Sequence, residues 1–237
     1  MRLQYIEEPQ LEFGTENHVC PKAGISQYNV YDTKIGSRRT EIFVGAIGTG
    51  DTLSKLNNWL DKCSQYIMGK PNSSNPKLDL DFCGFNLESG FKAKLNLEEI
   101  NTRKIKNSEI SKITKIQNWN KRVEEAVDLY YRQIKFLAQN RNVDVIVCTI
   151  PNDLYDYIAR EKAKPEEEKL YDELQDDRLE ANFRRALKAR TMSFGKPIQL
   201  IKELSLESNK KQQDSATKAW NWEHPILANR LSNNLSI

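Results

Sequence analysis

Two long stretches of the chain are apolar at almost every position, and each predicts a buried strand. The first, Thr40 to Ile47, is rich in β-branched residues and ends at Gly48-Thr49-Gly50, and the second runs from Val143 to Ile150. A strand that is apolar on both faces is typical of the middle of a parallel sheet. A third apolar run, Pro197 to Ile201, completes the set, and we expect it to lie beside Val145–Ile150 and parallel to it.

Apolar residues at helical spacing predict the elements between these strands. Asp51 is expected to cap a helix that carries apolar residues from Leu53 to Cys63 on one face. The strongest pattern runs from Trp119 to Gln139, with an apolar residue every three or four positions. Further helices are predicted from Asn152 to Arg160 and from Leu179 to Met192. This alternation indicates the α/β class, with a central, largely parallel sheet flanked by helices.

The segments outside this pattern are short or polar. Phe82 to Phe85 predicts a short strand, and the basic stretch after it has no clear periodicity. Met68 to Pro76 and Ser205 to Ser215 predict loops. Ala163 to Asp177 is a charged insertion with little to bury, so we expect it to be mobile and its deletion to leave thermal stability nearly unchanged.

Composition excludes several classes of protein. The 237 residues are 38% hydrophobic, and their 4 Trp, 9 Tyr and 8 Phe are too many for a disordered chain. The apolar runs are far shorter than the roughly 20 residues of a membrane span, and the N-terminus has no apolar signal segment. Cys20, Cys63, Cys83 and Cys148 form no CxxC pair, so a reduced, cytoplasmic protein without membrane contact is expected. His18 and Cys20 could share a metal, but no second pair completes a zinc site.

The net charge of +3 conceals an uneven distribution. Phe91 to Lys121 holds eight basic and three acidic residues, Arg160 to Glu180 holds five basic and nine acidic ones, and Ala181 to Lys202 holds six basic residues and no acid. An acid-free run on one helix–strand unit gives a positive field for an anion such as phosphate. A solvated helix face is the alternative interpretation of the same run.

No arrangement of residues indicates catalysis. The two histidines, His18 and His224, lie near opposite ends of the chain, outside any nucleophile-and-base pattern. The turn from Gly45 to Gly50 reads GxxGxG rather than GxGxxG, and no GK[ST] follows it. A tight βα turn explains this spacing, and an α/β enzyme that binds a nucleotide there is the alternative. We therefore predict a protein that is not an enzyme.

The acid-free segment carries the most informative group of residues. On a helix, Arg184 and Lys188 are four positions apart and share one face, where both can contact the same anion. A turn then leads into the strand near whose start Gln199 can offer an amide N–H. Two cations and an amide predict a phosphate pocket. By helical spacing, Arg190 is expected to point away from this pocket, toward solvent.

Short motifs along most of the chain resemble the MID region of prokaryotic Argonaute (Piwi-related) proteins, particularly the short type. The segment Glu8–Gly14 resembles the EP-x-L-x-FG opening of that group. In the later motif Tyr28–Asp32, Asn29-Val30 stands where the family usually has Gly-Pro. The other matching pieces follow in the same order: Gly24-Ile25, Tyr28–Asp32, Ile42–Gly48, Val145–Cys148 with Ile150-Pro151 and Leu154, Leu187–Met192, Pro197–Ile201 and Ala219–Asn221.

The resemblance implies a Rossmann-like MID domain that binds the 5′-phosphate of a short guide strand, either RNA or DNA. Residue by residue, Lys188 and Gln199 match the phosphate-binding Lys and Gln of the family, and Arg184 stands where Tyr is usual. Lys218 is the available match for a further lysine downstream. No catalytic residue, metal or cofactor is implied, other than a Mg²⁺ ion that could accompany the guide 5′-phosphate.

The resemblance also predicts how the chain is organised. Residues 1–110 would be an N-terminal extension that includes the strand–turn–helix unit, residues 111–222 the MID-like α/β domain, and residues 223–237 a tail where the RNase-H-like PIWI domain of the family would begin. This chain alone is therefore not expected to cleave nucleic acid.

The expected function is a non-catalytic, guide-binding module of a prokaryotic Argonaute defence system. Its partners would be the guide strand and either a separately encoded PIWI half or an Argonaute-associated effector protein. The alternative is a regulatory or interaction subunit, from a split or truncated Argonaute, that keeps the fold but has lost guide binding.

Overall fold

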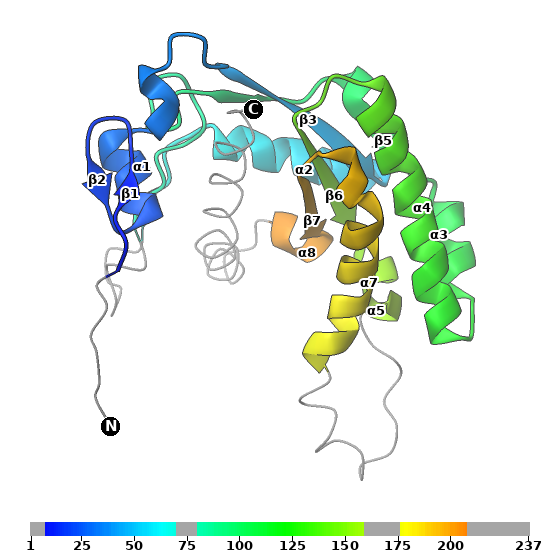
Figure 1. The fold of residues 1–237 in the computed structure, drawn as a ribbon. Helices are drawn as coiled ribbons and strands as arrows, with labels where there is room; N and C mark the ends of the chain where they lie inside the picture. The colour runs from blue at the N-terminus through cyan, green and yellow to red at the C-terminus, as the bar shows by residue number, and fades with distance from the viewer. Residues whose placement is uncertain (1–7, 70–79, 159–175, 208–237) are drawn as a thin grey trace, which may run out of the picture. The chain divides into compact units, whose positions relative to one another are not determined.

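The structure of the protein is a computed structural model that describes residues 8–69, 80–158 and 176–207 (Figure 1). These residues form two compact units. The first unit contains residues 8–42, 60–69 and 80–96, and the second contains residues 43–59, 97–158 and 176–207. This division differs from the predicted boundary at residue 110, because the strand–turn–helix unit near residue 45 shares a sheet with strands from the later part of the chain.

A mostly parallel, five-stranded sheet with helices on both faces gives the protein an α/β architecture that is compatible with a Rossmann-like fold (Figure 1). β3 (Glu41–Gly48) lies between β5 (Thr102–Lys104) and β6 (Val145–Ile150), and β7 (Ile198–Lys202) follows β6. These three pairs are parallel. The predicted neighbouring parallel strands, Val145–Ile150 and Pro197–Ile201, are confirmed.

The register between β3 and β6 is fixed by residues that are far apart in the sequence. Val44 lies opposite Val145. Just before β6, Asp144 accepts a hydrogen bond from the N–H of Phe43 at 2.9 Å, across 101 sequence positions. Because side chains alternate along a strand, this register also decides which residues of β3 face each side of the sheet.

The main core lies between one face of the sheet and a layer of helices. Ile47, Ile146 and Leu200 of the strands belong to this core, together with Leu137 and Leu187 of the helices. All five side chains are nearly inaccessible to water, which is the principal stabilising contribution to a fold of this kind. The helices of this layer are α3 (Asn107–Thr114), α4 (Trp119–Asn140), α5 (Asn152–Ile158) and α7 (Asp176–Thr191).

The opposite face of the sheet is covered by α2 (Gly50–Cys63), which follows β3 directly (Figure 1). Gly48 is required at the end of β3, because a Cβ there would overlap the hydroxyl of Thr149 and lie 2.5 Å from that of Thr52. Thr149 donates to the carbonyl of Ile47 at 3.1 Å, and its hydroxyl lies 2.7 Å from that of Thr52. A buried set of threonine hydroxyls thus joins α2 to the end of β6.

The first unit has a smaller core that contains several aromatic residues. Its buried aromatic residues include Phe13, Phe85 and Phe91, and the rings of the last two are stacked at 4.0 Å. Arg38 donates to the carbonyls of Phe91 and Lys92, at 2.7 Å each. The regular elements of this unit are β1 (Leu11–Glu12), β2 (Asn17–His18), α1 (Pro21–Tyr28), a 3₁₀ turn (Tyr31–Lys34) and β4 (Lys94–Asn96), which extends the sheet beside the start of β3.

Three sequence-based expectations are corrected by the structure. Asp51 does not cap α2, because the helix begins at Gly50 and the hydroxyl of Thr49 accepts from the N–H of Thr52 at 3.4 Å. The expected strand Phe82–Phe85 is reduced to one bridge between Phe82 and Ile67, since the chain turns at Gly84 with a φ of 78°. The basic stretch without periodicity contains regular elements: β4, a 3₁₀ turn (Glu99–Asn101), β5 and α3.

Several expectations lie wholly or largely outside the described residues. The insertion 163–177 is described only from Asp176, where α7 begins. Most of the expected loops Met68–Pro76 and Ser205–Ser215 is also outside the description, although Ser205 belongs to the short helix α8 (Glu203–Leu206). Lys218 and the tail 223–237 are outside it as well.

Candidate functional site

The carboxyl ends of the parallel strands share one edge of the sheet, where open α/β sheets usually bind ligands. This edge is reached by Gly48 of β3, Lys104 of β5, Ile150 of β6 and Lys202 of β7. The helix that follows β3 covers one face and the helix that follows β6 covers the other (Figure 1). The connections that follow β3 and β6 therefore run to opposite faces of the sheet. Ligands of open α/β sheets usually bind at such a point, beside the carboxyl ends of the strands.

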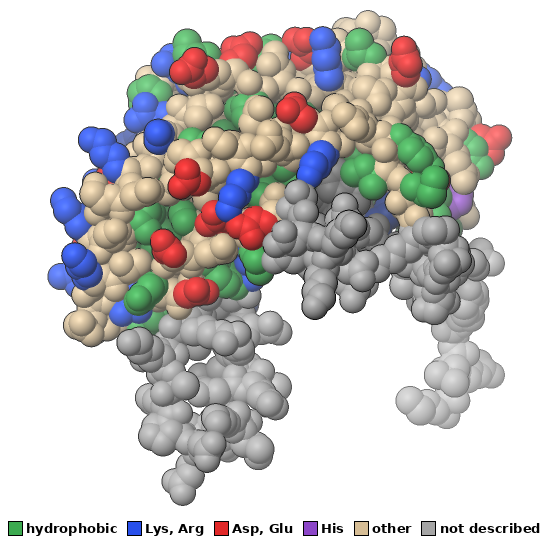
Figure 2. Space-filling model, turned by 180° about the vertical axis from the view of Figure 1, so that it is seen from behind, with side chains coloured by type: hydrophobic (Ala, Val, Ile, Leu, Met, Phe, Trp, Pro, Cys, Tyr) green, Lys and Arg blue, Asp and Glu red, His purple; other side chains and the backbone are tan. Residues whose placement is uncertain are grey.

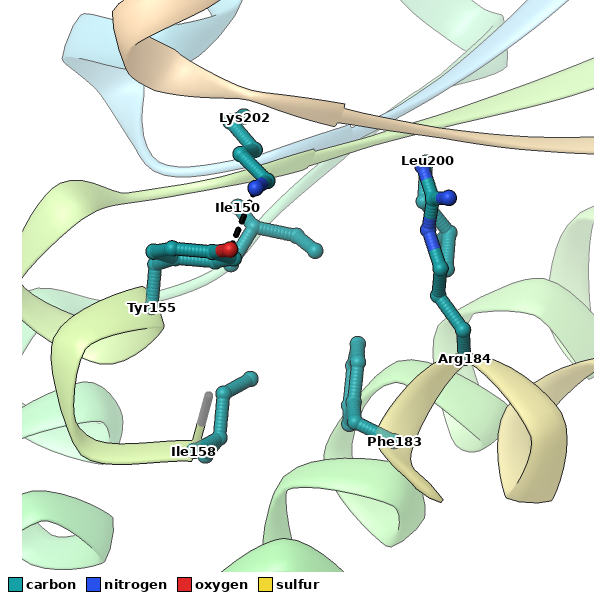
Figure 3. A pocket seen from close by; sticks show the side chains of 7 residues that line it. All are labelled: Ile150, Tyr155, Ile158, Phe183, Arg184, Leu200 and Lys202. Atoms are coloured by element: carbon teal, nitrogen blue, oxygen red, sulfur yellow. Dashed lines mark hydrogen bonds between the residues drawn. The ribbon is translucent and has the colours of Figure 1, made fainter. Parts of the chain in front are cut away.

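A small pocket opens at the end of β6 and β7 and has cationic side chains at its rim. Its apolar floor contains Ile150, Ile158, Phe183 and Leu200, and its polar residues are Arg184, Lys202 and Tyr155. Figure 3 shows Arg184 extending from α7 toward Leu200 of β7, while Lys202 and Tyr155 meet on the other side. The space open to the centre of a water molecule is about 10 Å³, so the interior has room for about one water.

Packing of the surrounding elements brings these side chains together. Phe183 and Leu187 of α7 are buried in the core, which leaves Arg184 half-buried at the rim. In β7, Ile198 and Leu200 face the same core, so Lys202 faces the same side two residues further on. Neither cation is in the deep interior, where two like charges would be costly.

Lys202 and Tyr155 form the best-defined polar contact of the pocket. The ammonium of Lys202 donates to the hydroxyl of Tyr155 and lies 4.1 Å from the centre of its ring. Tyr155 comes from the first turns of α5, directly after β6. The pair therefore connects the ends of two adjacent strands and holds a cation beside an aromatic ring, an arrangement that suits a phosphate with a planar group attached.

The structure only partly brings together the residues predicted from the sequence. Arg184 lines the pocket, but Lys188 is exposed and lies one helical turn closer to the opposite edge of the sheet, because α7 runs back antiparallel to the strands. Gln199 lies between the two core-facing residues Ile198 and Leu200, so its side chain faces the other side of the sheet. Its amide donates at 3.5 Å to the carbonyl of its neighbour Leu200.

Arg190 is exposed, as expected, but it also has partners on α4. It forms an ion pair with Asp128 of α4, and its guanidinium lies 4.1 Å from the centre of the Tyr131 ring. Tyr131 in turn stacks on Phe194 at 5.7 Å. These contacts connect the last turn of α7 to α4 through a side chain that stays exposed.

Lys202 and Tyr155 are site residues that were not predicted from the sequence. A signal for Lys202 is present, because it is two residues after Leu200 and four after Ile198, both of which are apolar. Gln199 is an odd number of positions from Lys202, so the two cannot share a face of a regular strand. No comparable signal existed for Tyr155, whose position depends on how α5 packs.

A second polar cluster lies at the same edge of the sheet and pairs one cation with two carboxylates. Lys55 of α2 donates to the carboxylates of Glu203 and Glu207, at 2.6 Å each. Glu203 also accepts the backbone N–H of Asn152 at 2.9 Å. Burial alone would raise the pKa of Glu203, but the hydrogen bonds from Lys55 and Asn152 outweigh it and lower the pKa below the ordinary 4.5. This cluster fastens α8 to α2 and to the start of α5.

The residues of the pocket do not fit a metal ion. Magnesium requires oxygen ligands such as carboxylates, whereas Arg184, Lys202 and Tyr155 offer two cations and one phenol. Within the described segments, no three His, Cys, Asp or Glu side chains converge. Burial raises the pKa of the Cys63 and Cys148 thiols, which keeps both protonated and inert.

Two further findings concern the chain beyond the pocket. Among the described residues, no helix combines the length and apolar character that a membrane crossing requires. No protein-family model matches the chain, and no curated protein sequence matches it.

Proposed function

We propose that the protein is a non-catalytic module that binds the 5′-phosphate end of a short nucleic-acid strand, as the guide-binding part of a prokaryotic Argonaute system. The observation that carries the proposal is the convergence of Arg184 and Lys202, with Tyr155, at the carboxyl ends of β6 and β7. In open α/β sheets this edge is where ligands bind, and a pair of cations favours a dianionic end group.

The pocket suggests how such an end would be recognised. Because its interior has room for about one water, a phosphate would bind at the rim, against Arg184 and Lys202. The Arg184 guanidinium can present two N–H groups to one phosphate, which gives direction as well as charge. The ring of Tyr155 beside Lys202 would lie against the sugar or base that follows.

Lys188 and Gln199, which match the family motif, have smaller roles in this proposal. Lys188 is on the same helix face as Arg184 and would act as an outer cation for the strand that leaves the pocket. Gln199 faces the other side of the sheet, so we do not assign it a contact with the same phosphate. The proposed partners remain a guide RNA or DNA, with a PIWI half or an Argonaute-associated effector encoded separately.

The proposal is tested with two adjacent arginines that differ in position but not in type. Arg184 lines the pocket, whereas Arg185 lines a separate groove between α4 and α7. Affinities of the full chain for matched 5′-phosphorylated and 5′-hydroxyl strands are measured by fluorescence anisotropy. Arg184→Ala should remove a preference of roughly tenfold or more for the phosphorylated end, since a charge-assisted hydrogen bond contributes about 1.5–3 kcal/mol. Arg185→Ala should leave the preference intact.

A second variant separates charge from packing. Lys202→Met keeps the apolar stem of the side chain but removes its ammonium, and should lower the preference in the same direction as Arg184→Ala. Equal affinity of the unmodified protein for both ends would contradict the proposal, as would equal effects of Arg184→Ala and Arg185→Ala.

One observation favours the alternative of a regulatory subunit without guide binding. Gln199 and Arg184 lie on different sides of the sheet, so the arrangement implied by the family resemblance is incomplete in this chain. This alternative predicts that neither strand binds at physiological salt, while the protein still associates with a PIWI-like or effector partner. The same anisotropy measurement distinguishes the two proposals.

A further inference from the structure

A strongly basic stretch of the chain runs from the end of β5 through α3 to the start of α4. Between Arg103 and Arg122 the sequence holds seven basic residues and one acid, Glu109. That acid is engaged locally, because its carboxylate accepts the N–H of Lys106 at 3.1 Å in the first turn of α3. Five lysines of this stretch are exposed and form no ion pair in the described structure. Lys121 belongs to α4, and the other four lie at the end of β5 and along α3 and its caps: Lys104, Lys106, Lys112 and Lys115.

Some cations elsewhere in the described chain do have acidic partners. Lys55 is paired with Glu203 and Glu207, Lys94 with Glu41, and Arg190 with Asp128. Within the described residues, the four lysines at β5 and α3 form no such pair, so no ion pair offsets their charge. Figure 2 shows Lys and Arg side chains gathered along the margin of the molecule that α3 and α4 form.

This surface lies next to the candidate pocket within the same compact unit. Lys104 ends β5 at the carboxyl edge of the sheet, with its ammonium beside Gly50. The buried guanidinium of Arg122 donates to the carbonyl of Ile116, just beyond α3, at 2.8 Å, and to that of Tyr157 in α5 at 2.9 Å. α3 is therefore fixed against α5, the helix that supplies Tyr155 to the pocket.

The chemistry of the surface favours a polyanion over a protein partner. The apolar residues of α3, Ile110 and Ile113, are buried in the core, so the exposed face carries lysines without an aromatic or aliphatic anchor. Protein interfaces depend on such anchors and are poor in lysine at their centres. An evenly charged, flexible polymer needs only cations at intervals, and Lys106, Lys112 and Lys115 provide them at the N-cap, the last turn and the C-cap of α3.

We propose that Lys104, Lys106, Lys112 and Lys115 form a second nucleic-acid contact, which binds the sugar–phosphate backbone of a single strand whatever group the strand carries at its 5′ end. The proposal extends the proposed function to the strand beyond its first phosphate, and it rests on nucleic-acid binding but not on recognition of the 5′ end. Each lysine that contacts a phosphate releases counterions, so the contact is recognised by its dependence on salt.

The test uses 5′-hydroxyl single strands, which have no terminal phosphate for the pocket. Lys112→Gln/Lys115→Gln removes two charges, one from the last turn of α3 and one from its C-cap, and leaves the N-terminal capping box of Lys106 and Glu109 intact. The slope of log affinity against log salt concentration should become shallower by about 1.4, or about 0.7 for each lost contact. Affinity at about 0.1 M salt should fall roughly tenfold or more. Lys34→Gln/Lys62→Gln is the matched control, because it removes the same two charges from exposed positions of the first unit.

Each outcome decides the proposal. A loss confined to the α3 variant, with unchanged thermal stability, supports it. Equal losses in both double variants would overturn it, because they would show only the effect of net charge. No binding of 5′-hydroxyl strands, or binding only to anionic lipid vesicles, would also overturn it. If the pocket does not recognise the 5′ end, the protein will have equal affinity for 5′-phosphorylated and 5′-hydroxyl strands. That result differs from a loss of binding in the α3 variant, so the two proposals can fail separately.

Discussion

The hydroxyl oxygens of Thr52 and Thr149 lie 2.7 Å apart in the buried space where α2 meets the end of β6. This contact is possible only because Gly48 has no side chain. Gly48→Ala should therefore lower the free energy of unfolding by about 1–3 kcal/mol, as overpacking of a buried site does. Urea denaturation with circular dichroism measures the change.

Gly36→Ala is the control for this prediction. A Cβ at Gly36 would meet no atom within 4 Å, so its effect on stability should stay within about 0.5 kcal/mol. Equal stability of the two alanine variants would contradict the prediction that a side chain at position 48 overlaps Thr52 and Thr149. Loss of stability in Gly48→Ala alone would support it.

Arg122 should be a structural residue despite its charge. Its side chain is only 9% exposed, and its guanidinium donates to main-chain carbonyls just beyond α3 and at the end of α5. Arg122→Met keeps most of the side-chain volume but leaves these acceptors without their donor, so the free energy of unfolding should fall by about 1.5–3 kcal/mol. Arg132→Met, at an exposed position of the same helix, should change it by less than about 0.5 kcal/mol.

The cluster around Glu203 predicts a loss of stability in acid. The pKa of Glu203 is lower in the folded than in the unfolded state, so its contribution is complete above about pH 4.5 and is lost as the pH falls through the folded pKa. On the alkaline side, the hydrogen bond to Glu203 raises the pKa of Lys55 above 10.5. The contribution of Lys55 is therefore complete below that pH and is lost only as the pH rises through the raised value.

Glu203→Gln checks this prediction in thermal melts at a series of pH values. The difference in Tm between the unmodified protein and Glu203→Gln should be largest near neutral pH and should shrink as the pH falls below about 4. Glu99→Gln removes an exposed carboxylate instead, and its Tm should follow that of the unmodified protein throughout. A pH-independent difference for Glu203→Gln would mean that the carboxylate contributes through packing rather than through its charge.

Much of the fold could be predicted because its central elements are long and regular. The predicted helix Trp119–Gln139 is confirmed as α4, and the predicted strand Thr40–Ile47 as β3. The three-residue strands β4 and β5 could not be predicted, since they are basic or polar and owe their structure to the neighbouring β3. For α3 a signal was present in Ile110 and Ile113, but the surrounding lysines obscured it.

The candidate site was less predictable than the fold. Arg184 and Lys188 share a helix face as predicted, yet only Arg184 lines the pocket, because the pocket opens at one end of α7. Helical spacing states which residues share a face but not how far each lies from the edge of the sheet. The place of Tyr155 follows from tertiary packing between α5 and β7, which no local pattern encodes.

Biosynthesis makes β3 long before the strand that completes its pairing. The N–H of Phe43 and the carboxylate of Asp144 that accepts it are 101 residues apart. At translation rates of about 5–20 residues per second, a nascent chain carries this apolar strand for about 5–20 s before β6 is made. An unpaired apolar strand is a template for pairing with another chain. The yield of folded protein therefore depends on how well the nascent chain is protected during those seconds, and not only on the stability of the finished sheet.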